Sequence, residues 1–101
     1  MTDPDQKHWM HGLEQEDVVF IKRFILFSGS LKDLADAYQV SYPTLRLRLD
    51  RLIEKIKVLD DHKIEDEFER QLRAQFADGK LEPAVFKKLL STYQNQKKAT
   101  K

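Results

Sequence analysis

Two hydroxyl-bearing residues and three arginines lie close together between positions 42 and 51. A guanidinium group can donate two parallel hydrogen bonds to O6 and N7 of guanine, so Arg46 and Arg48 are candidates for contacts with base edges or phosphates. Tyr42 and Thr44 could bind phosphate or meet a thymine methyl, and Arg51 could contact the phosphate backbone. These residue types suit nucleic-acid binding, and the candidate site comprises Tyr42, Pro43, Thr44, Arg46, Leu47, Arg48 and Arg51.

The apolar residues of the same stretch predict a helix that begins at Tyr42 and turns the candidate side chains outward. Leu45, Leu49 and Leu52 recur at helical spacing, so they mark the inward face. Ser41 can accept a hydrogen bond from a backbone N–H two or three residues further on, which makes it a good N-cap. A proline in the first turn suits a helix start, because no intrahelical hydrogen bond needs its missing N–H. The predicted helix therefore presents its arginines to solvent beside an exposed N-terminus.

A shorter amphipathic segment, Leu31 to Tyr38, comes directly before this helix. Only the residues from Gln39 to Ser41 separate the two segments, so the helices must cross at a steep angle. A close crossing needs a small residue at the contact, and Ala35 occupies the position where it is wanted. We therefore interpret residues 31–59 as a helix-turn-helix, a motif whose second helix reads the major groove of DNA in many proteins.

The remaining segments also predict helices, so the expected fold class is all-α. Leu13 to Phe27 is apolar over more than half of a helix circumference, and the next two helices can cover only part of it. Directly after Leu59 there is neither a glycine nor an alternating strand pattern, so no β-hairpin wing is expected. Asp61 to Ala77 and Leu81 to Gln96 predict an antiparallel helical hairpin that docks on the core or on a partner subunit. The expected organisation is a flexible lead-in (1–12), a trihelical helix-turn-helix domain (13–59), a C-terminal helical hairpin (60–96) and a basic tail (97–101).

The string SYPTLRLRLDRLIEKI, which follows FIKRFILFSGSLKDLADAY, resembles a bacterial family known as domain of unknown function 2089. Members carry a similar Ser-Tyr-Pro-Thr-hydrophobic-Arg stretch after a Gly-Ser/Asn-Leu-Lys segment, and the resemblance covers about Leu13 to Ile56. It implies a helix-turn-helix protein that is assumed to regulate transcription. Many members also carry a cysteine-rich zinc ribbon at the N-terminus. This chain has no cysteine, so a function that resides in the ribbon cannot be transferred to it.

The sequence offers little for catalysis. It has no cysteine nucleophile, Gly-rich phosphate loop, dinucleotide fingerprint or Ser-His-Asp spacing, so we expect neither an enzyme nor a bound cofactor. His8 and His11 are close enough in sequence to share a metal ion, but two ligands make a poor zinc site. The acidic residues between positions 60 and 69 are distributed around a predicted helix, so they indicate a solvated face rather than a cation site.

The charge distribution allows double-stranded DNA as the partner, although the net charge of the 101-residue chain is only +1. Positive charge gathers in residues 31–59, which sum to +2, and in residues 70–101, which sum to +6, on either side of an acidic stretch. No apolar run of membrane-spanning length and no secretory leader are present, so a cytoplasmic protein without a membrane partner is expected. A single helix-turn-helix offers few base contacts, so we also expect a homodimer.

A second hypothesis places the chain in a different class, the non-catalytic protein-interaction modules. The strongly apolar Leu13 to Phe27 segment, a hairpin that must dock and the low net charge are all compatible with a protein partner. Leu47 fits either hypothesis, because an apolar side chain among arginines can meet a thymine methyl or a protein surface. Salt dependence separates the two, since phosphate contacts weaken steeply with salt whereas an apolar contact barely responds.

Overall fold

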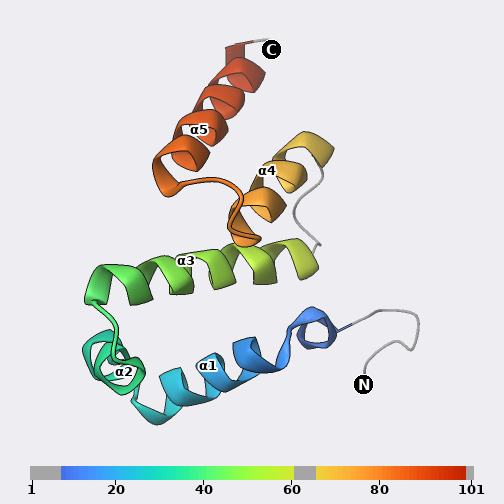
Figure 1. The fold of residues 1–101 in the computed structure, drawn as a ribbon. Coiled ribbons are helices and arrows are strands. Elements are labelled where there is room, and N and C mark those ends of the chain that lie inside the picture. The colour runs from blue at the N-terminus through green and yellow to red at the C-terminus, as the bar shows by residue number, and fades with distance from the viewer. Residues whose placement is uncertain (1–7, 61–65, 100–101) are drawn as a thin grey trace.

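The computed structural model describes residues 8–60 and 66–99, and within these ranges it contains helices but no strands (Figure 1). The expected all-α fold class is confirmed. The chain forms a short 3₁₀-helix, η1 (Trp9–Gly12), and the helices α1 (Gln15–Leu26), α2 (Leu31–Tyr38), α3 (Tyr42–Leu59), α4 (Glu67–Ala77) and α5 (Pro83–Ala99). The predicted range of the fourth helix, 61–77, is too long, because Asp66 is an extended N-cap and α4 begins only at Glu67; residues 61–65 lie outside the described residues. Helix α5 continues into the stretch assigned to a basic tail. No described helix is both long and apolar enough to cross a bilayer.

Local hydrogen bonds that the sequence predicts set up the helix-turn-helix. The hydroxyl oxygen of Ser41 caps α3 by accepting a hydrogen bond of 3.3 Å from the backbone N–H of Thr44. Ser30 caps α2 in the same way through the N–H of Asp33, at 3.2 Å. Gly29 has a positive φ of 78°, which glycine adopts without strain, and it lets the chain turn between α1 and α2. The expected Ser41 cap is confirmed.

The first hydrophobic core lies where α1, α2 and α3 meet. Ala35 is 4% exposed there, as expected for a small residue at a close helix crossing. Full burial of one large apolar side chain contributes about 1.5 to 3 kcal/mol, so this core supplies much of the stability of the domain. The buried residues are Phe20, Leu34, Ala35, Leu45 and Leu52, and Leu13, Ile21, Phe24, Leu31, Tyr38, Leu49 and Ile56 pack around them.

Helix α3 is the central layer of the molecule, with α1 and α2 on one side and the α4–α5 hairpin on the other (Figure 1). A second core forms where the hairpin meets α3. Leu72, Phe76 and Phe86 are buried in it, and Leu47 of α3 packs against them. The rings of Phe76 and Phe86 are stacked with their centroids 4.4 Å apart. The sequence left open whether the hairpin docks on the core of its own chain or on a partner subunit. In this structure it docks on its own chain.

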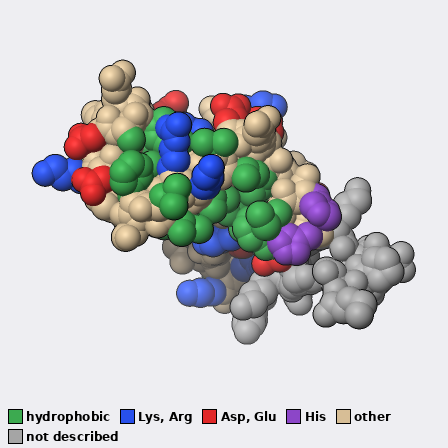
Figure 2. Space-filling view, turned by 90° about the horizontal axis from the view of Figure 1, so that it is seen from below, with side chains coloured by type: hydrophobic (Ala, Val, Ile, Leu, Met, Phe, Trp, Pro, Cys, Tyr) green, Lys and Arg blue, Asp and Glu red, His purple; other side chains and the backbone are tan. Residues whose placement is uncertain are grey.

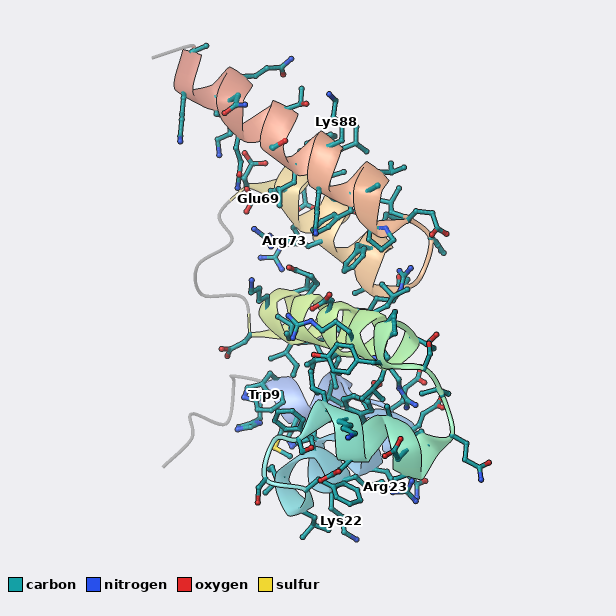
Figure 3. All side chains as sticks on the ribbon, turned by 90° about the vertical axis from the view of Figure 1, so that its left-hand side faces the viewer. Trp9, Lys22, Arg23, Glu69, Arg73 and Lys88 are labelled. Carbon is teal, nitrogen blue, oxygen red and sulfur yellow. The ribbon has the colours of Figure 1, made fainter. Side chains whose placement is uncertain are left out.

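Ionic contacts reinforce the packing of α4 on α3. The guanidinium of Arg73 lies between two carboxylates, 2.7 Å from Glu54 of α3 and 3.3 Å from Glu69 of its own helix (Figure 3). Arg70 donates a hydrogen bond of 3.1 Å to the backbone carbonyl of Val58 near the end of α3. The side chains of Arg73 and Glu54 are both largely shielded from water, so salt screens this pair less than it would a surface pair. Helix α4 is therefore held along the C-terminal part of α3.

The outer face of α1 remains uncovered, because the hairpin docks on the opposite side of α3. Figure 2 looks onto this side of the molecule and shows apolar side chains gathered around a few basic ones. Ile25 and Leu26 are 67% and 69% exposed, and Val18 and Phe27 are exposed as well. The sequence predicted that α1 is too apolar to be covered by α2 and α3 alone, and the hairpin does not supply the missing cover.

The start of α4 is tied to α5 through Asp66, and this tie makes stability depend on pH. The Asp66 carboxylate accepts hydrogen bonds from the Tyr93 hydroxyl and the backbone N–H of Glu69, and it lies 3.0 Å from the Lys97 ammonium. The hydrogen bond from Tyr93, followed by that from Lys97, holds the pKa of Asp66 well below its ordinary value of 3.8. A carboxyl with a depressed folded-state pKa stabilises the fold above its ordinary pKa, and this contribution is lost as the pH falls below that value.

We therefore expect the melting temperature to fall as the pH is lowered from about 5 to about 2, and to fall less in the Asp66→Asn variant. Thermal unfolding followed by circular dichroism at several pH values measures both curves. Asp33→Asn is the matched control, because Asp33 is an exposed residue near the start of another helix. Parallel curves for the wild type and Asp66→Asn would show that this carboxylate has no special role.

Candidate nucleic-acid interface on helix α3

The first turn of α3 is open to solvent. Tyr42 is 52% exposed, and Pro43 and Thr44 are exposed beside it. The Ser41 hydroxyl donates a hydrogen bond of 2.9 Å to the Thr44 hydroxyl oxygen, so the Thr44 hydroxyl can still donate its own hydrogen to a ligand. These three candidate residues are accessible, as the helical pattern predicted.

Arg46 also faces solvent, where it forms an ion pair with Asp50 one turn further along α3. The paired atoms are 3.2 Å apart, and the two side chains are 50% and 41% exposed. An exposed i,i+4 pair contributes only about 0.3 to 0.5 kcal/mol, so a phosphate can readily replace Asp50 as the partner of this guanidinium. Arg46 is therefore available to a phosphate or a base edge.

The prediction that Leu47 and Arg51 face open solvent is wrong, because the hairpin packs against this side of α3. Leu47 joins the second hydrophobic core. Arg51 donates hydrogen bonds to the backbone carbonyls of Phe76 and Leu81, the latter at 3.3 Å, and its guanidinium lies 4.8 Å from the centre of the Phe76 ring. These two side chains thus hold the hairpin on α3, and they are not free to enter a DNA groove.

Arg48 also departs from the predicted outward direction. Its guanidinium carbon lies 4.8 Å from the centre of the Phe20 ring and 5.1 Å from the centre of the Tyr38 ring. The side chain is therefore half-buried and leans toward α1 and α2. Its contacts are with aromatic rings rather than with carboxylates, so its N–H groups keep their capacity to bind an anion.

A hollow of about 420 Å³ separates this side of α3 from the start of α1 and the end of α4. Basic residues of α3 meet carboxylates there, and Lys55 forms a short ion pair of 2.6 Å with Asp17. The hollow is lined by Arg48, Arg51, Lys55, Thr44, Leu47 and Leu52 of α3 and by Glu14, Asp17, Ala77 and Asp78 opposite them. Its charge is mixed, so this hollow is not a cationic groove that would attract a duplex by itself.

The two histidines considered as metal ligands lie at η1, with their ring centroids 6.0 Å apart. The Nδ1 atom of His8 accepts a hydrogen bond of 3.2 Å from the backbone N–H of Met10. Within residues 8–60 and 66–99, no three potential ligands among histidine, cysteine, aspartate and glutamate come together. His8 and His11 thus have no third ligand in the part of the chain that the structure describes.

One residue near the candidate site escaped the sequence reasoning. Arg23 of α1 places its guanidinium carbon 5.0 Å from the centre of the Tyr38 ring, which Arg48 contacts from α3. Sequence spacing marks Arg23 only as a polar interruption of an apolar helix. Residues 23 and 48 belong to different helices, so their approach to a common ring depends on how the helices pack.

Residues 13–59 match the family model described as Domain of unknown function (DUF2089)-HTH. Over this segment, which is just under half of the chain, the protein is similar to the DUF2089-HTH family. The matched segment runs from just before α1 to the last residue of α3, so it coincides with the three helices around the first core. The resemblance seen in the sequence is confirmed, and the α4–α5 hairpin lies beyond the matched segment. No curated protein and no solved structure matches this chain.

Proposed function

We propose that the DUF2089-HTH domain binds double-stranded DNA as a transcriptional regulator, and that the first turn of α3 carries the contacts. The observation that supports this most is the exposure of Tyr42, Thr44 and Arg46 at the capped end of the second helix of a helix-turn-helix. Recognition helices of this motif contact base edges through their N-terminal residues. The hairpin does not cover this turn, because the first residue of α3 that packs against the hairpin is Leu47.

The roles of the candidate residues follow from their accessibility. Arg46 is the residue for a guanine edge or a phosphate, because its partner among the described residues is an exposed carboxylate. The hydroxyls of Tyr42 and Thr44 are suited to phosphate oxygens. Pro43 shapes the helix start, and Leu47 and Arg51 act indirectly by fixing the hairpin.

So short a contact surface requires a second copy of the domain. One exposed turn reads few base pairs, and paired helix-turn-helix domains extend the site by contacting half-sites about one helical turn of DNA apart. The uncovered apolar face of α1, which includes Ile25 and Leu26, supports pairing because exposed apolar area of this kind commonly lies at protein interfaces. We therefore propose a homodimer on DNA.

The variant Arg46→Gln is expected to weaken binding to a short duplex by about tenfold, since one bidentate contact contributes about 1 to 3 kcal/mol. Lys57→Gln is the matched control. Both residues lie on α3, are about half exposed and pair with a carboxylate of their own helix, but Lys57 lies near the far end. Fluorescence anisotropy with a labelled duplex at low salt measures both affinities, and circular dichroism verifies that both variants fold.

Equal affinities of the wild type and Arg46→Gln would exclude the first turn of α3 as the contact. A duplex that fails to bind the wild type even at low salt would exclude the DNA-binding function itself. Arg48→Ala is a poorer probe than Arg46→Gln, because it also removes contacts with two core rings and so changes stability together with charge.

The exposed end of α1 favours one alternative function, a protein-interaction module without a nucleic-acid ligand. Ile25 and Leu26 are the most exposed large apolar side chains of the described residues. An apolar contact at this face would be almost insensitive to salt, whereas binding through several phosphates weakens by orders of magnitude between low and moderate salt. The salt dependence of complex formation therefore decides between the two functions.

A further inference from the structure

Three helices each contribute one residue to a compact cluster beside the first core. Arg23 comes from α1, Tyr38 is the last residue of α2, and Arg48 comes from α3. The guanidinium carbons of both arginines lie close to the centre of the Tyr38 ring, at 5.0 and 5.1 Å. The ring of Phe20, 5.9 Å from that of Tyr38, forms a further surface under Arg48. The cluster exists only when the three helices are assembled.

The two arginines of this cluster differ from the other arginines of the described residues. Within residues 8–60 and 66–99, Arg23 and Arg48 contact aromatic rings but form no ion pair and donate no hydrogen bond. Every other arginine there has a carboxylate or a backbone carbonyl as its partner: Arg46, Arg51, Arg70 and Arg73. Two guanidinium groups therefore share one ring, while their N–H donors have no acceptor among residues 8–60 and 66–99.

A hollow of about 510 Å³ opens beside these donors. It is lined by Arg23, Tyr38 and Arg48 together with Gln15, Glu16 and Val19 of α1. Glu16 is the one carboxylate in this lining, so the lining carries one surplus positive charge. The Gln15 side chain adds an amide that can donate a hydrogen bond. An oxyanion with several acceptor oxygens would satisfy the guanidinium donors and reduce the repulsion between the two like charges.

We propose that Arg23, Tyr38 and Arg48 form a phosphate-binding site on the flank of the helix-turn-helix. Each guanidinium lies over an aromatic ring, and a guanidinium in that place can still use its N–H groups for the fork-like contact that arginine makes with phosphate. The phosphate belongs either to the DNA backbone or to a free phosphorylated ligand. The first case rests on the proposed DNA binding: Arg48 lies one turn after Thr44 on α3, so a strand that meets the first turn can continue onto this site.

Inorganic phosphate tests the site without DNA. In the wild type, a titration followed by two-dimensional NMR should shift the Nε–H signals of Arg23 and Arg48 in a saturable way at millimolar phosphate, whereas chloride at equal ionic strength should not. Arg23→Gln should abolish the saturable shift at Arg48. Lys22→Gln is the matched control, because Lys22 is the exposed neighbour of Arg23 on α1 and points in another direction (Figure 3). It should leave the titration unchanged.

A duplex titration identifies the source of the phosphate. If the site binds the DNA backbone, Arg23→Gln should reduce the slope of log K against log salt by about 1, the value for one lost phosphate contact. Arg23→Lys should restore most of that slope, because the ammonium keeps the charge, but not the saturable shift at Arg48. If the wild type binds phosphate but no duplex, the proposed DNA binding fails and the site stands as one for a free phosphorylated ligand.

The proposal is overturned if phosphate shifts all exposed arginines alike and without saturation, which identifies an adventitious ion only. It is also overturned if Arg23→Gln melts like the wild type and leaves both the phosphate titration and the duplex slope unchanged. If the Arg23→Gln variant still binds a duplex and this binding still depends on Arg46, the proposed DNA binding stands and only the phosphate site is rejected.

Discussion

Replacement of Phe20 by alanine is expected to lower the free energy of unfolding by about 3 to 5 kcal/mol, the usual cost of removing a buried aromatic side chain. Phe20 is 1% exposed in the first core. The whole stability of a small domain is about 5 to 15 kcal/mol, so this single change removes a large part of it. We expect the variant to be largely unfolded well below the melting temperature of the wild type.

Phe20 also supports the flank of the helix-turn-helix. Its ring stacks near that of Tyr38 and lies under the guanidinium of Arg48, so its loss removes one surface that holds Arg48 in place. Phe27→Ala is the matched control, because Phe27 is the same residue type just after the end of α1 and is 36% exposed. Its cost should stay below about 1.5 kcal/mol, since much of its ring is already in contact with water.

Urea unfolding followed by circular dichroism measures both free energies. Similar losses for Phe20→Ala and Phe27→Ala would contradict the placement of the first core, because the two residues differ mainly in burial. An unchanged slope of unfolding free energy against urea would further show that the wild type and the variants expose similar surface on unfolding.

The second large effect is expected from Phe76→Ala, which should detach the α4–α5 hairpin from α3. Phe76 is 4% exposed, stacks on Phe86 and lies under the guanidinium of Arg51. Removal of its ring should cost about 3 to 5 kcal/mol of docking free energy. A two-helix hairpin has too little buried area to stand alone, so α4 and α5 should lose their structure once they leave α3.

Amide hydrogen exchange measures this effect helix by helix. In Phe76→Ala the amides of α4 and α5 should exchange much faster, while those of α1 and α2 keep more of their protection because the first core does not include Phe76. Phe68→Ala is the matched control on the same helix, since Phe68 is 53% exposed and should cost about 1 kcal/mol or less. Equal acceleration in all five α-helices would show that the two cores unfold as one unit.

Release of the hairpin has a functional consequence as well. Leu47 and Arg51 lose their partners in Phe76→Ala and become exposed on α3. If DNA binding uses only the first turn of α3, the affinity of this variant for a duplex at low salt should change little. A large gain in affinity would instead indicate that the hairpin masks part of the interface.

Most helices of this protein could be predicted from local signals. The serine caps of α2 and α3, the glycine turn after α1 and the repeated apolar positions all act within a few residues, so the chain needs no distant contact to specify them. The small residue at the helix crossing could also be predicted, because the short turn between α2 and α3 allows only a close approach. Ala35 is buried as this reasoning requires.

The direction of the arginines could not be predicted in the same way. A helical wheel divides α3 into an inward and an outward face, but it assumes that only one side of the helix is packed. Here α3 lies between two layers, so Leu47 and Arg51 fall under the hairpin although they oppose the first core. Arg46 remains exposed, because it belongs to neither core and its partner among the described residues is Asp50 of the same helix.

By itself the sequence determined an all-α chain with a helix-turn-helix of the DUF2089 type, because caps, turns and apolar periodicity are short-range properties. Only the tertiary structure decided which side of α3 the hairpin covers, and which arginines share the Tyr38 ring. Both depend on contacts between helices that lie far apart in the chain. Their relative orientation is selected by how buried side chains fit together, and no local pattern encodes that fit.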